Sequence, residues 1–258
     1  MALTARLYLC GFPKSGLHLA GLWAEAILTP EYSRVGNWFG TMGGGGWTCE
    51  SVNVELIERA LKSIRPGYYL KGHMGWSPAL GQLFFKMGIG VAFLMRDLRD
   101  VVVSHAHHVC STDDEKLKHP DKELYRARGS FEDVLIGCIE GVAQYPGIFE
   151  RWEFYAGWLT EQWVLPLRFE QMVEHPRQWA MALARYAYTV AGETPPQNIR
   201  AVGREMAQAG RHTKKSPTFR KGAIGDWRAA FTPRVKDCFK AHDPGWLVKL
   251  GYTRNNEW

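Results

Sequence analysis

The segment from Gly11 to Gly16, with the sequence GFPKSG, has the residue types of a phosphate-binding loop. It lies between a short β-type run at residues 6–10 and a stretch at residues 16–28 that can form a helix. The first N–H groups of a helix have no internal partners and lie at the positive end of the helix dipole, so they attract anions. Glycine allows the backbone to approach a phosphate, and Lys14 adds a full positive charge. The pattern therefore predicts an anion site where the strand ends and the helix begins.

The spacing within this segment argues against a nucleoside triphosphate as the ligand. The Walker loop reads GxxxxGK[ST], and both Gly11 and Gly16 fit that pattern. Leu17 and His18 stand where the pattern requires a lysine and the hydroxyl that binds magnesium. Walker-type chemistry is therefore disfavoured, and a nucleotide kinase-like phosphotransferase is kept as an alternative.

Two later segments also combine cations with positions suited to a phosphate. Arg96 follows an apolar run and offers a fork of donors, and Ser104 supplies a hydroxyl about two helical turns farther on. Arg220 and Lys221 precede Gly222, which combines charge with room for the backbone. A nucleic-acid patch is the alternative for this basic run, but few aromatic residues interrupt it. A solvated helix cap and ion-pair network is expected from three other residues: Asp97, Arg99 and Asp100.

Taken in order along the chain, these segments resemble the motifs of sulfotransferases that use 3'-phosphoadenosine 5'-phosphosulfate (PAPS). Residues 13–16 resemble the start of the family's PKSGTTW loop for the 5'-phosphosulfate, and residues 96–104 resemble its RDxRDxxxS motif for the 3'-phosphate. The most specific match is RKGAIGDW at residues 220–227, which resembles the family's RKGxxGDW loop. The resemblance extends over residues 6–232, and the chain is identified as a member of this family.

The resemblance implies transfer of a sulfuryl group from PAPS to a hydroxyl or nitrogen of a small-molecule acceptor. The segment YLKGH resembles the family's KxH segment, which implies that His73 is the catalytic base. Lys71 would stabilise the transferring sulfuryl group, and Lys14 the leaving phosphate oxygen. The residues implied to bind the cofactor are Pro13, Lys14, Ser15, Gly16, Leu17, His18, Arg96, Ser104, Phe169, Arg220, Lys221 and Gly222.

The chain departs from the family pattern at several of these positions. Leu17, His18 and Leu19 replace Thr, Thr and Trp, so two phosphate-binding hydroxyls and an adenine-stacking ring are missing. Phe169 replaces the tyrosine of the family's YED segment, which removes a hydroxyl but leaves a ring that can pack near the adenine. These losses keep open a noncatalytic domain that binds an adenine nucleotide or polyanion.

Short apolar runs alternate with segments of helical periodicity along the chain. Buried parallel strands are predicted at residues 6–10, 68–71, 90–95 and 163–168. Helices are predicted at roughly residues 54–64, 131–143, 151–159 and 177–190. The expected fold is therefore α/β, with a central, mainly parallel sheet flanked by helices, and this agrees with the P-loop-like sulfotransferase fold that the resemblance implies.

Length and composition point to one globular domain over residues 1–258. Hydrophobic residues make up 46% of the chain, which excludes a disordered or fibrous protein. Lys and Arg number 32 against 26 Asp and Glu, a balance that suits an anionic ligand without requiring a nucleic-acid partner. The five cysteines include no CxxC pair and favour reduced thiols. Since no signal peptide or long apolar span is recognisable, the expectation is a soluble, cytoplasmic protein without a membrane partner.

Some features receive no specific ligand from the sequence. No metal is expected. The histidines of residues 105–108 are predicted to lie on the surface of a helix and not to bind a metal ion. The four-glycine run at residues 43–46 is expected to be a surface loop. Residues 32–47, 110–131 and 149–158 are expected to shape the acceptor pocket but carry no recognisable motif, so the acceptor and the oligomeric state stay open.

Overall fold

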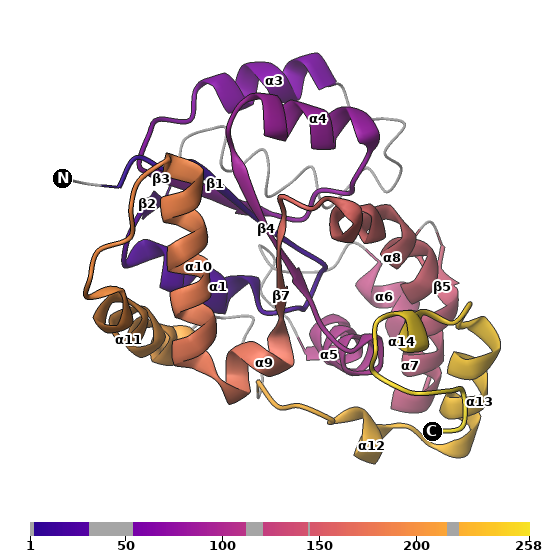
Figure 1. Ribbon diagram of the computed structural model, residues 1–258. Helices are drawn as coiled ribbons and strands as arrows, with labels where there is room; N and C mark the ends of the chain where they lie inside the picture. Colours follow the sequence, from indigo (N-terminus) through magenta and orange to yellow (C-terminus); the bar gives the residue numbers. More distant parts are fainter. Residues whose placement is uncertain (1–2, 31–53, 112–120, 144, 216–221) are drawn as a thin grey trace. The chain divides into compact units, whose positions relative to one another are not determined.

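A computed structural model describes residues 3–30, 54–111, 121–143, 145–215 and 222–258 of the chain. They form two units (Figure 1). The first combines Met1–Met95 with Phe154–Phe219, and the second combines Arg96–Glu153 with Arg220–Trp258. Each unit is therefore assembled from segments that are distant in the sequence.

The first unit is built on a five-stranded sheet with the strand order β2-β3-β1-β4-β7, in which every neighbouring pair is parallel. The strands are β1 (Leu7–Gly11), β2 (Thr29–Pro30), β3 (Tyr68–Gly72), β4 (Gly90–Met95) and β7 (Leu165–Arg168). Because β1 and β3 are parallel neighbours, their carboxyl ends meet at one edge of the sheet. Residues 12–16 and His73 follow these strands directly, so both segments leave the sheet at that edge.

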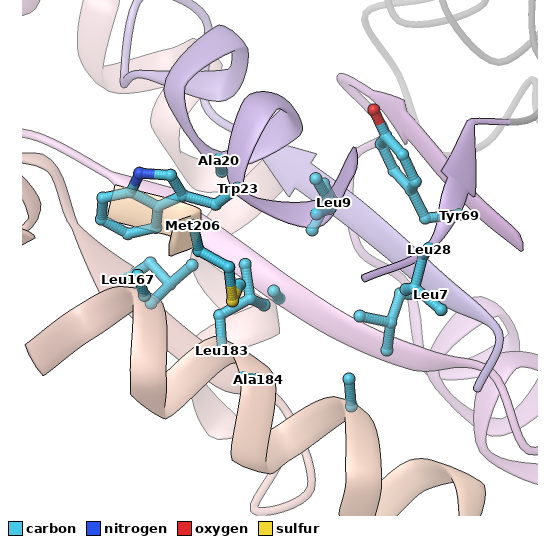
Figure 2. Close-up of a cluster of buried hydrophobic side chains, with 14 of the residues drawn as sticks. Leu7, Leu9, Ala20, Trp23, Leu28, Tyr69, Leu167, Leu183, Ala184 and Met206 are labelled. Carbon is cyan, nitrogen blue, oxygen red and sulfur yellow. The ribbon is translucent and has the colours of Figure 1, made fainter. Parts of the chain in front are cut away.

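Alternate side chains of β1 pack on opposite faces of the sheet. Leu7 and Leu9 join a buried apolar cluster with Trp23 and Leu183 (Figure 2). This face is covered by α1 (Leu17–Glu25), α10 (Pro176–Ala191) and α11 (Ile199–Ala209). On the other face, Tyr8 stacks on Phe84 of α4, with ring centroids 5.3 Å apart. The helices on this second face are α3 (Val54–Lys62) and α4 (Pro78–Lys86).

Shorter elements complete the first unit. They are α9 (Phe169–Glu174), the 3-10 turns Gly157–Thr160 and Gly210–Lys215, and the end of α8 (Ile148–Ala156), a helix that begins in the second unit. The helix α4 begins at an ordinary N-terminal cap, where the Ser77 hydroxyl accepts a hydrogen bond from the Leu80 backbone N–H and Pro78 takes the first helical position. By contrast, α1 begins after Gly16 without any side-chain cap.

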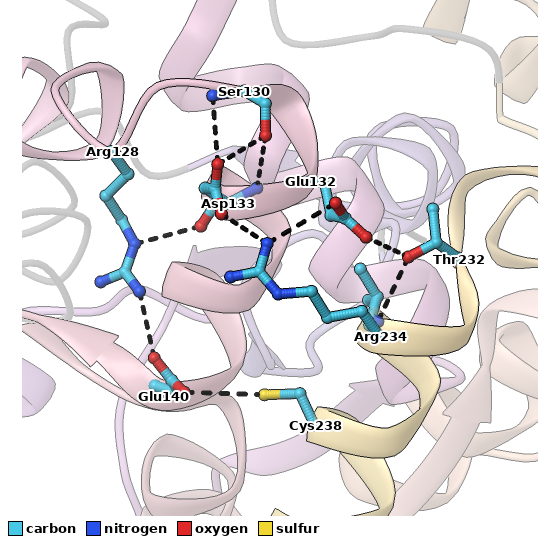
Figure 3. Close-up of polar contacts among 9 residues, drawn as sticks. Arg128, Ser130, Glu132, Asp133, Glu140, Thr232, Arg234 and Cys238 are labelled. Atoms are coloured by element: carbon cyan, nitrogen blue, oxygen red, sulfur yellow. Dashed lines mark hydrogen bonds and ion pairs between the residues drawn. The ribbon is translucent and has the colours of Figure 1, made fainter.

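The second unit consists mainly of helices. They are α5 (Leu98–Ser111), α6 (Lys122–Arg126), α7 (Phe131–Glu140), α12 (Trp227–Ala230), α13 (Pro233–His242) and α14 (Trp246–Lys249), with a short antiparallel hairpin of β5 (Gly141–Val142) and β6 (Tyr145–Pro146). Ser130 and Asp133 form a capping box at the start of α7 (Figure 3). Thr232 caps α13 and donates a hydrogen bond to Glu132, so the first turns of α7 and α13 are joined.

The predicted α/β class with a parallel sheet is confirmed, and the predicted strands correspond to β1, β3, β4 and β7. The helix predicted at residues 131–143 is wrong at its end, because Gly141 has a φ of 101° and the chain turns there into β5. The segment predicted as a helix at residues 151–159 begins earlier, at Ile148, and ends as a 3-10 turn. The four-glycine run lies outside the described residues, and a single domain over residues 1–258 stays a prediction.

Candidate active site

The loop after β1 has a tight backbone conformation. The Phe12 backbone N–H donates to the Leu94 carbonyl over 2.9 Å, and the Ser15 N–H donates to the Phe12 carbonyl over 3.1 Å. Lys14 has a φ of 70° and Gly16 a φ of 93°, both in the left-handed region. That region is natural for glycine but unfavourable for lysine. The loop therefore holds a charged residue in a conformation that costs folding energy, as is typical of functional sites.

The start of α1 fits an anionic group such as the 5'-phosphosulfate of PAPS. The helix has no side-chain cap and no acidic residue in its first turn, so its leading N–H groups face no competing carboxylate of that turn. Ser15 is 1% exposed, and its Oγ has no hydrogen-bond partner among the described residues. A buried hydroxyl without a partner is costly unless a ligand supplies one. The residues present therefore suit the group that the loop is predicted to bind.

Phe169 packs directly on this loop. A Cβ atom placed on Gly16 would lie 2.6 Å from Cδ2 of the Phe169 ring, which is closer than a real contact allows. Phe169 is buried and begins α9, immediately after β7. The ring thus forms a wall of the loop, and only glycine fits at position 16. The expected packing of Phe169 against an adenine stays a prediction.

His73 follows β3 and is hydrogen-bonded to the end of the neighbouring strand. Its Nδ1 lies 2.6 Å from the carbonyl oxygen of Gly11. A carbonyl can only accept, so this bond assigns the proton to Nδ1 and leaves the lone pair on Nε2. The backbone carbonyl of His73 itself accepts from the Tyr155 hydroxyl over 3.2 Å. The imidazole is therefore held in one tautomer and one orientation.

The electrostatic surroundings keep His73 neutral. Burial lowers its pKa below the ordinary value of 6.5, the hydrogen bond to Gly11 opposes this shift, and the positive charge of Lys14 lowers the pKa further. A neutral imidazole with a free Nε2 can accept a proton near pH 7.

His18 and Lys71 belong to the same group of basic side chains. The pKa of His18 is lowered to about 4, first by loss of hydration and then by the charges of Lys71, His73 and Lys14. The ammonium of Lys71 runs beside α1, with its Nζ 3.4 Å from the position that a Cβ on Gly21 would take. The positive charges of Lys14 and Lys71, beside two neutral imidazoles, suit an anionic ligand.

In the second unit, Arg96 and Asp100 connect residues 96–104, the predicted 3'-phosphate segment, to the RKGxxGDW loop by hydrogen bonds. The Arg96 Nη2 donates to the Ala223 carbonyl over 2.7 Å. The Asp100 carboxylate accepts from the Gly225 N–H over 2.7 Å and from the Trp227 N–H over 3.1 Å. Two motifs far apart in the sequence are thereby brought together within this unit.

Asp97 and Arg99 form the predicted cap and ion pair, but the network is not solvated. Asp97 accepts from the Arg99 backbone N–H over 3.0 Å, and the Arg99 Nη2 lies 2.7 Å from its Oδ2. Asp97 is 6% exposed and Arg99 is 3% exposed. The expectation of a solvated network is therefore wrong, because aromatic rings cover the guanidinium of Arg99.

The remaining predicted residues are distributed as follows. Ser104 is half-buried on α5, and Gly222 has a φ of 62°, whereas Arg220 and Lys221 lie outside the described residues. Pro13 lies within the loop after β1, and Leu17 is the first residue of α1. The structure thus groups the loop, Lys71, His73 and Phe169 in the first unit, and Arg96, Ser104 and Gly222 in the second.

The histidines after Ser104 are not part of a metal-binding cluster among the described residues. Within the described part of the chain, no group of three or more His, Cys, Asp or Glu side chains could hold a metal ion. His105 is buried and stacks on Tyr145, with ring centroids 5.2 Å apart, so this histidine belongs to the core and does not decorate the surface of the helix.

Two contacts of His73 were not predicted from the sequence. The Gly11 carbonyl that orients His73 is a backbone group and leaves no signal in residue type. Tyr155, which contacts both His73 and Phe12, belongs to the segment 149–158 that is expected to shape the acceptor pocket, but no motif indicates its contact with His73. No helix among the described residues is long and apolar enough to cross a membrane.

Comparison with known proteins identifies the family. A profile described as the sulfotransferase domain matches residues 6–243. Sulfotransferase 1A1 of Mus musculus is 24% identical over 258 residues, which covers 90% of this chain and 80% of the relative. Sulfotransferase 1E1 of Bos taurus is 24% identical over 211 residues, which covers 75% of this chain and 66% of the relative.

Solved structures of similar fold agree with this match. Mouse sulfotransferase SULT7A1 complexed with PAP has a TM-score of 0.62 and 18% identity, and the match covers 98% of this chain and 87% of that one. Retinol dehydratase in complex with androsterone and inactive cofactor PAP has a TM-score of 0.54 and 14% identity, with 92% of this chain and 78% of that one covered. Because the family match includes the loop after β1, His73 and the Arg96 network, the chain belongs to the sulfotransferase domain family and is a sulfotransferase.

Proposed function

We propose that this sulfotransferase transfers the sulfuryl group of PAPS to a hydroxyl or nitrogen of a small-molecule acceptor, with His73 as the base. The observation that carries the proposal is the 2.6 Å hydrogen bond between His73 Nδ1 and the Gly11 carbonyl. It leaves Nε2 unprotonated beside the loop that contains Lys14. The PAP that two structural neighbours hold supports PAPS as the donor.

In the proposed transfer, His73 Nε2 takes the proton of the acceptor hydroxyl, and the hydroxyl oxygen forms a bond to sulfur. PAPS supplies the activated sulfuryl group, whose bond to the 5'-phosphate breaks in line, so the bonding electrons stay with the phosphate oxygen. The products are the sulfated acceptor, 3'-phosphoadenosine 5'-phosphate (PAP) and a proton that His73 later releases.

The first unit supplies charge where the reaction develops it. We assign Lys14 to the leaving phosphate oxygen, and the first N–H groups of α1 with the Ser15 hydroxyl to the rest of the 5'-phosphosulfate. Lys71 adds positive charge toward the sulfuryl group, and its place in the group of basic side chains around His18 supports this role. No metal is required in this scheme, because side chains and backbone N–H groups provide the stabilisation.

The second unit is assigned to the 3'-phosphate. Arg96 and Ser104 on one segment, and Gly222 with the preceding Arg220 and Lys221 on the other, are the proposed ligands. The bonds of Arg96 and Asp100 to the loop at Ala223, Gly225 and Trp227 support this role, because they join the two segments that carry those residues.

The cytoplasm is the proposed compartment. The described cysteines Cys10, Cys110, Cys138 and Cys238 are free thiols, which are typical of proteins in a reducing compartment. Burial raises the pKa of Cys10 and of Cys138 to about 12, so these thiols are protonated and poor nucleophiles.

The cofactor assignment is tested by calorimetric titration with PAP, ADP and ATP, each with and without magnesium. We expect metal-independent binding of PAP that is at least tenfold tighter than binding of ADP, because Arg96 and its partners recognise the 3'-phosphate. Magnesium-dependent ATP binding would favour a phosphotransferase instead. Absence of nucleotide binding would contradict the proposal.

The base assignment is tested by His73→Ala with His242→Ala as the matched control. We expect His73→Ala to abolish sulfuryl transfer and to leave PAP affinity within about twofold, since the proton transfer and not nucleotide binding depends on it. His242 lies in the second unit, where its Nδ1 bonds to its own helix, and its loss should leave the activity unchanged. Retained transfer in folded His73→Ala would exclude the base.

A further inference from the structure

Arg99 is enclosed between two tryptophans of the second unit. Its guanidinium carbon lies 3.9 Å from the ring centre of Trp227 and 4.5 Å from that of Trp258. The two indoles meet edge to face, with centroids 5.1 Å apart. Cation–π contacts of this kind stabilise most when the cation is desolvated, and Arg99 is only 3% exposed.

Trp258 is itself held in place by α13. Its ring lies 5.6 Å from that of Phe239, and the ammonium of Lys240 lies 5.3 Å from its centre. Trp258 therefore connects α13 to the guanidinium of Arg99. It has no bond in the described residues to any of the proposed ligands of the 3'-phosphate.

A series of contacts through Arg99 connects Trp258 to the proposed ligands of the 3'-phosphate. Arg99 forms an ion pair with Asp97, the residue after Arg96, and the Asp97 carboxylate also accepts from the Arg99 backbone N–H. Trp227, the other wall of the enclosure, donates its backbone N–H to Asp100. Asp100 also holds the Gly225 N–H and lies 3.8 Å from the Arg96 guanidinium. The aromatic enclosure thus fixes both segments that carry the proposed phosphate ligands.

We propose that Trp258 is a positioning residue for recognition of the cofactor's 3'-phosphate, which it controls by enclosing Arg99 against Trp227. The inference rests on the proposed function. Without the second indole, Arg99 gains water and alternative rotamers, so Asp97 and Trp227 lose their fixed partner. Arg96 and the loop from Gly222 to Trp227 are then less well ordered before the ligand binds, and binding must supply that order.

The test compares PAP with adenosine 5'-monophosphate, which lacks the 3'-phosphate, on the full chain by calorimetry or competition. For Trp258→Ala we expect about tenfold weaker binding of PAP, as the loss of a desolvated cation–π contact implies, and binding of the monophosphate within about twofold of wild type. KM for PAPS should rise while kcat changes little.

Substitutions that preserve folding separate positioning from simple destabilisation. Trp258→Phe keeps a ring over Arg99 and should restore most of the PAP affinity, whereas Trp258→Leu keeps apolar volume without a π face and should behave like Trp258→Ala. Trp246→Ala is the matched control, because Trp246 is also a tryptophan of this unit, packed on Lys249 and Trp152 and not on Arg99.

Two results would overturn the inference while the proposed function stands. One is a PAP affinity that is unchanged in Trp258→Leu, and the other is an equal loss for both ligands. If wild-type protein itself binds PAP no better than the monophosphate, the assigned 3'-phosphate site is wrong, and the inference is overturned together with it.

Discussion

Substitution of Gly16 by alanine tests the geometry of the loop after β1. Two costs apply, and they are separable. An L-residue at a φ of 93° is strained by about 1–2 kcal/mol. The new Cβ would also lie 2.6 Å from Cδ2 of Phe169, and such overpacking costs a further 1–3 kcal/mol or so. We therefore expect the free energy of unfolding of Gly16→Ala to fall by about 2–5 kcal/mol.

Gly192→Ala is the matched control, because Gly192 also has a positive φ, of 68°, but nothing lies within 4 Å of its added Cβ. It should cost only the backbone strain, about 1–2 kcal/mol. The assay is urea unfolding of each variant monitored by tryptophan fluorescence. In a Phe169→Val background, Gly16→Ala should cost no more than Gly192→Ala, because the ring that it strikes has been removed.

The reasoning is refuted if Gly16→Ala costs no more than Gly192→Ala in the wild-type background, or if the Phe169→Val substitution brings no relief. Either result would mean that the Phe169 ring does not pack on the loop. Binding of PAP adds a functional readout, and we expect it to weaken at least tenfold in Gly16→Ala, because the shifted loop misplaces the N–H groups at the start of α1.

Three further outcomes follow from charge and capping. Burial and the charge of Lys14 lower the pKa of His73, so the acid limb of the pH profile of kcat/KM should have its midpoint below pH 6.5. In the residual activity of Lys14→Met, that midpoint should move upward. A wild-type midpoint above pH 6.5 would contradict the lowered pKa of His73. The pKa of His18 is about 4 in the folded state against 6.5 ordinarily, so between these pH values the folded state binds fewer protons than the unfolded state, and stability should decline as the pH falls from 6.5 to 4. Thermal melts of His18→Gln should show a smaller decline over this range. An equal decline would exclude His18 as its source. Ser130→Ala removes the capping box of α7 and should lower the free energy of unfolding by about 1 kcal/mol in urea titrations, whereas no loss would show that the cap contributes nothing.

The strands β1, β3, β4 and β7 could be predicted because their residues carry the signal locally, whereas β2, with only two residues, was not predicted. Gly90–Met95 is a continuous apolar run that matches β4, as a strand buried on both faces requires. The helix α11 was not predicted. Its buried residues Ile199, Gly203 and Met206 follow a helical spacing, but charged and polar residues separate them. The helix packs on α10, which precedes it in the chain.

The same distinction applies to the site. The loop and His73 could be predicted because each follows an apolar run that forms a strand, and parallel neighbouring strands end at the same edge of a sheet. Arg96 could be predicted because its charge directly follows the apolar run of β4. The orientation of His73 could not, since it depends on a backbone carbonyl of another strand. The enclosure of Arg99 could not either, because Trp227 and Trp258 are distant from it in the sequence and meet it only in the folded chain.

The left-handed conformation of Lys14 has a consequence for how this protein can change. Folding alone would favour glycine or asparagine at a φ of 70°, so lysine at this position lowers the stability of the fold, a cost that its proposed role at the leaving phosphate oxygen would offset. On the role proposed for Lys14, selection for heat resistance without selection for activity would favour its replacement, and the resulting protein would be more stable and less active. Selection for stability and selection for the proposed activity therefore favour different residues at position 14.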